Sequence, residues 1–96
     1  MRMVLVIYEA GIEEDLTGVL IEARITAFTK QTGAVGNGRK GLRLGTQIWP
    51  GTNNLLWIAL PDDRVQQFVQ QLRSLKESYV KPPALQIFVF PVEMLD

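Results

Sequence analysis

The side chains that most enzymes use for catalysis are sparse in this chain of 96 residues, which contains no cysteine and no histidine. Thiol nucleophiles, disulfides, Ser/His/Asp hydrolysis and ordinary zinc or copper sites therefore lack their main component. We expect a protein that binds a partner or a small ligand and that is not an enzyme.

A glycine-rich segment carries the clearest chemical signal. Residues 36–41 have the sequence GNGRKG, which matches the pattern G-x-G-x-x-G, but residues 42–46 lack the helical period that a dinucleotide fingerprint requires. Backbone N–H groups of neighbouring glycines can instead form a concavity for an anion, and Arg39 and Lys40 add positive charge. An anion site and a flexible glycine-rich turn both stay open as interpretations.

Charge and aromatic residues in the middle of the chain leave similar alternatives. Residues 23–61 contain five basic side chains and no acidic one, as expected either of a solvated loop and edge strand or of a docking place for an anion. Trp49, which precedes a Pro-Gly turn, suits a packing anchor or a partner-binding knob. The acidic run at residues 13–15 is typical of the first turn of a helix, where it compensates the dipole.

Hydrophobic periodicity predicts six elements. Strands are expected at residues 3–8, 24–35, 55–60 and 85–90. The first helix is expected from Ile12, with a buried stripe at Leu16, Val19 and Leu20. The second follows Pro61 with Asp62 or Asp63 as its N-cap, and it stops before residues 82–83. Between the second and third strands, residues 36–54 are expected to form a long loop.

The order βαββαβ predicts one α+β domain over residues 1–96 with a ferredoxin-like fold, in which two helices cover one face of a four-stranded antiparallel sheet. The first, third and fourth strands are apolar on both faces, so a second copy packed sheet to sheet is expected to cover the other face. The third strand lacks the aromatic pattern of RNA-binding domains, so no nucleic acid is expected. Apolar runs too short for a signal peptide or a membrane span predict a cytoplasmic protein without direct membrane insertion.

The chain resembles the PII-like signalling proteins, relatives of the nitrogen regulatory protein PII and of the CutA group, nearly from end to end. The resemblance rests on residues 25–29 (ITAFT), 36–39 (GNGR) and 87–93 (IFVFPVE). Residues 44–53 (LGTQIWPGTN) match a short subgroup with a GTxxWPGxN signature.

This resemblance implies a homotrimer with the sheets facing inward and with effector sites in the clefts between subunits. The expected effector is an adenine nucleotide or another small anion, bound by residues at matching positions together with the neighbouring lysine: Thr29, Gly36, Gly38, Arg39 and Lys40. The loop over residues 36–54, with Arg43, Trp49 and Asn53, is expected to contact a protein target, for which a membrane transporter is one candidate.

The chain departs from the family pattern at several positions. KPPAL at residues 81–85 replaces the glycine-rich phosphate loop before the last strand, and Gln86 replaces a basic residue. Gln47 stands where a subgroup histidine is expected, and no metal ligand is predicted. A CutA-like metal-tolerance protein and a purely structural oligomer remain the alternatives to an effector-binding regulator.

Overall fold

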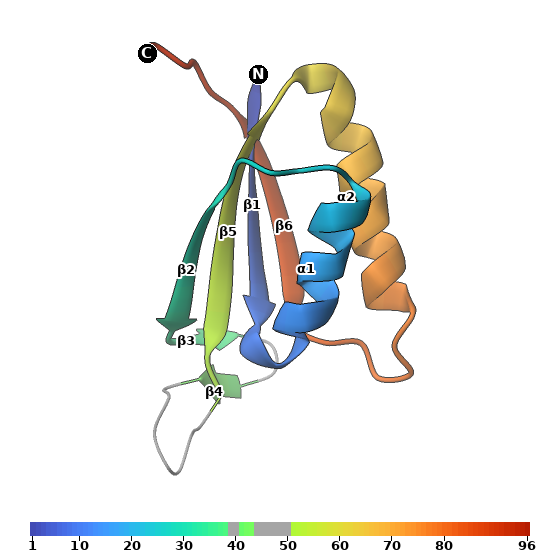
Figure 1. Cartoon of the computed structure of the whole chain (residues 1–96). Coiled ribbons are helices and arrows are strands. Elements are labelled where there is room, and N and C mark those ends of the chain that lie inside the picture. The colour runs from blue at the N-terminus through green and yellow to red at the C-terminus, as the bar shows by residue number, and fades with distance from the viewer. Residues whose placement is uncertain (39–40, 44–50) are drawn as a thin grey trace.

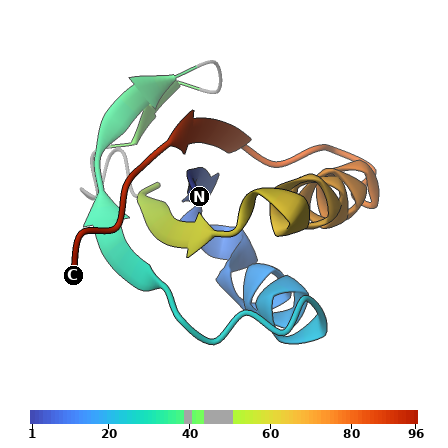
Figure 2. The same ribbon diagram turned by 90° about the horizontal axis from the view of Figure 1, so that it is seen from above.

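The computed structural model describes residues 1–38, 41–43 and 51–96. Its elements in chain order are β1 (Arg2–Glu9), a 3-10 turn η1 (Ala10–Ile12), α1 (Glu13–Glu22), β2 (Thr29–Ala34), β3 (Gly36–Gly38), β4 (Gly41–Arg43), β5 (Asn53–Leu60), α2 (Asp62–Glu77) and β6 (Leu85–Pro91). Four of the strands form an antiparallel sheet in the order β2-β5-β1-β6 (Figure 1). Both helices lie on the same side of this sheet (Figure 2). The predicted ferredoxin-like α+β fold is therefore confirmed.

The core lies between the sheet and the helices, and it follows from strand alternation. Val4 and Val6 on β1 face Ile58 and Leu56 on β5, and all four are fully buried. Every second strand residue reaches this layer because successive side chains point to opposite faces of a sheet. The helices complete the core with the stripe that their spacing predicts: Ile12, Leu16, Val19 and Leu20 before and along α1, and Val65, Phe68 and Leu72 along α2.

The prediction of a structureless loop over residues 36–54 is wrong in part. β3 and β4 form an antiparallel hairpin in which Gly36 pairs with Arg43 and Gly38 pairs with Gly41. β5 also begins at Asn53, inside the segment predicted to be loop. Strands of three residues are too short to show a hydrophobic period, and glycine, which is depleted in strands, hides them further. Residues 39–40 and 44–50 lie outside the described part of the chain.

The second strand is shorter than predicted, because the chain first closes the end of α1. β2 begins at Thr29 and not at Arg24. The amide of Ile25 donates to the carbonyl of Leu20, and the amide of Arg24 donates to that of Ile21, both at 3.0 Å. This is the Schellman pattern, which requires a left-handed residue at Arg24, where φ is 59°. The conformation costs a non-glycine residue about 1 to 2 kcal/mol.

The start of α2 also differs from the prediction that Asp62 or Asp63 caps it. Pro61 occupies the N-cap position without a side-chain bond, and both aspartates lie in the first turn. Asp62 instead contacts the N-terminal ammonium of the chain at 2.9 Å, and this hydrogen bond lowers the pKa of its carboxyl group. A proline with fixed φ fits the N-cap backbone, so the helix starts without a capping side chain. Among the described helices, none is long and apolar enough to cross a membrane.

Candidate functional site

Of the residues predicted to bind a ligand, the three that the structure describes do not meet within one chain. Thr29 begins β2 and is exposed, whereas Gly36 and Gly38 lie on β3 beyond the other end of that strand. At about 3.3 Å per residue, the segment from Thr29 to Gly36 spans at most about 23 Å, because β2 has a register shift between Gln31 and Ala34. Arg39 and Lys40 lie outside the described residues. In a single copy Thr29 lies at mid-length of the sheet, in register with Trp57 and Leu5, whereas Gly36 and Gly38 lie on the hairpin beyond one end of β2 (Figure 1).

The residues predicted to contact a partner are placed only in part. Arg43 lies on β4, in register with Gly36 of β3, and Asn53 is the first residue of β5. The side-chain oxygen of Asn53 is buried and lacks a hydrogen-bond partner among the described residues. Trp49 falls in the segment that the structure leaves undescribed. Arg43 therefore lies in the hairpin, and Asn53 lies at the adjoining end of the sheet, in register with Ala34 of β2 (Figure 1).

The sequence analysis missed a polar cluster around Glu13 that lies beneath this end of the sheet. Tyr8 Oη and Asn54 Nδ2 donate to Glu13 Oε1 at 2.6 and 2.8 Å. Lys30 Nζ donates to Glu13 Oε2 at 2.5 Å, and Thr17 Oγ1 donates to the same oxygen at 3.0 Å. The carboxylate at the start of α1 is therefore bonded to β1, β2 and β5 at once. We name these five residues the Glu13 cluster.

The Glu13 cluster holds its carboxylate in the ionised form. Burial alone would raise the pKa of Glu13, but hydrogen bonds from Lys30, Tyr8, Asn54 and Thr17 outweigh it and lower the pKa from 4.5 to about 2. Burial also raises the pKa of the Tyr8 phenol, and its hydrogen bond to the Glu13 carboxylate raises it further. At neutral pH the cluster contains one carboxylate and one ammonium group, with Tyr8 as a neutral donor.

Alternation along the strands was the signal that could have found this cluster. Tyr8 pairs with Asn54 across β1 and β5, and both side chains lie on the covered face of the sheet among apolar neighbours. A buried asparagine in an otherwise apolar strand face requires a hydrogen-bonding partner. The acidic first turn of α1 supplies that partner, so Glu13 does more than compensate the helix dipole.

A second set of contacts fastens residues 78–84, which connect α2 to β6, to the same end of the sheet. Glu9 bonds Ala84 twice, through its backbone amide at 3.0 Å and through its carboxylate at 2.6 Å. Lys76 Nζ donates to the carbonyl of Leu85 at 3.1 Å. The Tyr79 hydroxyl donates to Asp15 on α1. Burial raises the pKa of Tyr79, and this hydrogen bond raises it further, to about 12. The connection from α2 to β6 is therefore bonded to β1 through Ala84 and to α1 through Tyr79.

The sheet presents an apolar surface on the side away from the helices. Across its central strands Leu5 pairs with Trp57 on one side and with Phe88 on the other. Phe88 is 46% exposed and Phe90 is 39% exposed. Within the described part of the chain, no helix covers these side chains (Figure 2). We name this surface the outer sheet face: Met3, Leu5, Ile7, Leu55, Trp57, Ala59, Phe88 and Phe90.

The outer sheet face carries a polar edge on β2. Trp57 Nε1 donates to Gln31 Oε1 at 2.7 Å, so the indole N–H is satisfied without a partner molecule. Thr29 pairs with Trp57 and Gln31 with Leu55, which places both polar residues beside the apolar surface. The predicted ligand residue Thr29 therefore lies at the border of the outer sheet face.

Metal ligands do not gather in the described parts of the chain. Over residues 1–38, 41–43 and 51–96, no group of three or more Asp, Glu, His or Cys side chains could hold a metal ion. The carboxylates of Glu13 and Glu9 are already bonded to protein donors. No metal site is therefore assigned.

Comparison with known proteins identifies the fold. No protein-family model matches the sequence, and no curated protein is detectably similar to it. Solved structures do match. CPII, a nitrogen regulatory PII-like protein from Thiomonas intermedia K12, superposes with a TM-score of 0.74 at 19% identity over 93% of this chain and 82% of its own, and that structure is bound to ADP, AMP and bicarbonate.

A second protein points the same way. A protein from Thermus thermophilus that carries the name PII-like signaling protein has a TM-score of 0.65 at 21% identity, over 93% of this chain and 83% of its own. The structural neighbours of the chain are thus PII-like proteins, as the sequence resemblance implies, and the chain has their ferredoxin-like fold. The signature at residues 44–53 stays a prediction.

Proposed function

We propose that this chain is a PII-like regulatory protein that assembles as a homotrimer through the outer sheet face. The observation that carries the proposal is the apolar character of that face, which includes Leu5, Trp57 and Phe88. At about 25 cal/mol per Å², covering a few hundred Å² of such surface is worth several kcal/mol to whatever packs on it. Because other copies of the chain are always present with it, a second copy is the partner that we expect to cover this face.

The positions of the predicted ligand residues support a site between subunits. Thr29 borders the outer sheet face at one end of β2, and Gly36 lies past the other end. Packing of copies around the outer sheet face can bring the Thr29 end of one subunit near the hairpin end of the next. We propose that the effector binds in such a cleft, which a single copy lacks.

The ligands of the structural neighbours suggest the effector class. CPII was determined with ADP, AMP and bicarbonate, and all three are small anions. The basic side chains of Arg39 and Lys40 suit an anion, whereas the backbone of residues 36–38 is extended and paired with β4, so it does not form the N–H concavity that the glycines suggested. We propose an adenine nucleotide or another small anion, bicarbonate included, as the effector of this chain.

The proposed output is a protein contact made by residues 36–54. The effector would change the conformation of this segment and so modulate a target, for which a membrane transporter remains a candidate. Arg43, Trp49 and Asn53 would make the contact. The proposal contains no covalent step and therefore no catalytic residue.

Calorimetric titration with ADP, AMP and bicarbonate tests the effector and its location together. Phe88→Glu places a carboxylate on the outer sheet face and is expected to break the assembly and to abolish binding. Ile21→Glu is the matched control, because Ile21 is 73% exposed on α1, on the opposite side of the sheet. It should keep both the assembly and the binding.

Three results would contradict parts of the proposal. Full binding by a monomeric Phe88→Glu variant would contradict the proposal that the effector binds in a cleft between subunits. Assembly without binding of any of the three compounds would leave a purely structural oligomer. Binding lost equally in both variants would show that the added carboxylate, wherever it lies, repels the anion.

A further inference from the structure

A cavity that is partly open to solvent lies on the helix side of the sheet, away from the outer sheet face and from the hairpin. It encloses about 240 Å³ between the end of α1, the residues that follow it and the first half of α2. Ile25, Leu60 and Phe68 form an apolar, buried base. Its polar wall is made by Glu22, Arg24, Arg64, Gln67 and Gln71.

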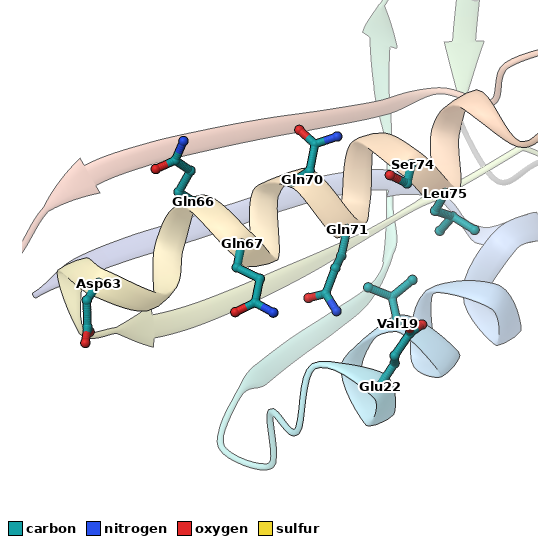
Figure 3. A pocket seen from close by; sticks show the side chains of 9 residues that line it. All are labelled: Val19, Glu22, Asp63, Gln66, Gln67, Gln70, Gln71, Ser74 and Leu75. Carbon is teal, nitrogen blue, oxygen red and sulfur yellow. The ribbon is translucent and has the colours of Figure 1, made fainter.

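The two side-chain amides of the polar wall, Gln67 and Gln71, lie on the side of α2 that faces α1. Figure 3 views the neighbouring groove between the helices, which shares Glu22, Gln67 and Gln71 with the cavity. Gln67 and Gln71 project from α2 toward the end of α1 that carries Glu22, whereas Gln66 and Gln70 project the other way. Gln67 and Gln71 thus line the same cavity as Arg24 and Arg64.

Arg64 is fixed in place by the end of α1. Its Nη2 donates to the carbonyl of Ala23 at 2.9 Å. A guanidinium group has five N–H donors in a planar fork, and one of them accounts for this bond. Among the described residues, the structure records no further bond of the Arg64 side chain. The anchored guanidinium can therefore present its remaining donors to a ligand without losing its orientation.

Arg24 stands at a position that the fold alone would give to glycine. Its φ of 59° is the only positive φ of a non-glycine residue in the described ranges. Glycine would hold the same helix end without strain. The Arg24 side chain makes no recorded hydrogen bond or ion pair within the described part of the chain. The hydrogen bonding at the end of α1 therefore explains the left-handed backbone at this position, but it does not explain why the residue is an arginine.

We propose that this cavity binds a small organic carboxylate. Guanidinium groups recognise the planar carboxylate through paired N–H bonds, and the two amides can complete its hydrogen bonding. Arg24 and Arg64 against Glu22 leave one net positive charge, which suits a singly charged anion better than a doubly charged phosphate. Asp63 lines the adjoining groove and not this cavity. The volume is below that of drug-sized sites and fits a ligand of a few heavy atoms.

Titration of the isotope-labelled protein with L-glutamate, acetate and inorganic phosphate tests the proposal by nuclear magnetic resonance. The side-chain amide signals of Gln67 and Gln71 report occupancy directly. We expect saturable shifts with at least one carboxylate and about tenfold weaker binding of phosphate. In Arg24→Gly, carboxylate binding should weaken about tenfold or more, while the melting temperature does not fall, because glycine relieves the backbone at this position.

Arg73→Ala is the control, because Arg73 is an exposed arginine on α2 that does not line the cavity. It should bind like the unaltered protein. The proposal is overturned if no carboxylate gives a saturable shift, if Arg24→Gly binds normally, if Arg73→Ala loses binding equally, or if phosphate binds as tightly. The outcome is independent of the proposed effector site, since Arg24→Gly should keep its response to adenine nucleotides.

Discussion

Replacement of Glu13 by glutamine tests how the hairpin end of the sheet is held together. The variant keeps the size of the side chain and removes its charge. Lys30 Nζ, at 2.5 Å from Glu13 Oε2, then loses its anionic partner in a half-buried position. Tyr8 and Asn54 can still donate to the amide oxygen, so the expected loss is mainly that of the charge.

The size of the loss follows from the Glu13 pKa. A fall from 4.5 to about 2 corresponds to about 3 kcal/mol if it is fully expressed. Because the Glu13 side chain is 34% exposed, screening by solvent reduces this, and we expect Glu13→Gln to lower the free energy of unfolding at pH 7 by about 1 to 2 kcal/mol.

The shifted pKa also predicts how the stability difference between the two proteins changes with pH. The pKa of Glu13 is lower in the folded state, so its contribution is present above the ordinary value of 4.5 and is lost as the pH falls through about 2. Urea unfolding of both proteins between pH 7 and pH 2 is the assay. The difference between them should be largest at neutral pH and should vanish near pH 2.

A constant difference at every pH would refute this reasoning, because it would assign the loss to packing and not to the ionised carboxylate. Lys30→Met supplies the partner variant for a double-mutant cycle. A coupling energy near zero between Glu13 and Lys30 would refute the ion pair as the main source of the effect.

The remaining predictions concern the core, the α2–β6 connection and the end of α1. Leu72→Ala removes a fully buried side chain and should lower the free energy of unfolding by about 2 to 5 kcal/mol in urea titration. Tyr79→Phe should cost about 0.5 to 1.5 kcal/mol through the lost bond to Asp15. Because the pKa of Tyr79 is raised to about 12, its contribution should be complete below pH 10 and lost as the pH rises through 12, which phenolate absorbance can follow. Arg24→Gly should raise the free energy of unfolding by about 1 kcal/mol, measured by thermal unfolding.

The elements that bury one regular face could be predicted from the sequence. Short, nearly continuous apolar runs that are bounded by turn residues define β1, β5 and β6, and the spacing of Leu16, Val19 and Leu20 defines α1. The second apolar face of the sheet could be predicted too, because β1 and β5 lack polar residues at the alternate positions between residues 3 and 7 and between residues 55 and 59.

Features that depend on non-local contacts could not be predicted. The hairpin of β3 and β4 consists of backbone pairing between glycine-rich segments, which leaves no side-chain period. The Glu13 cluster joins residues up to 46 positions apart, from Tyr8 to Asn54, and only the strand register brings them together. The left-handed Arg24 was hidden because arginine is a common helix residue and glycine is the usual signal for such an end.

The mass of the protein in solution tests the central claim most directly. Sedimentation equilibrium at micromolar concentration should give about three times the 10.8 kDa of one chain for the unaltered protein and for Ile21→Glu, and a smaller species for Phe88→Glu. A single stable species of 10.8 kDa for the unaltered protein would show that the outer sheet face stays uncovered, and the proposed clefts between subunits would not exist.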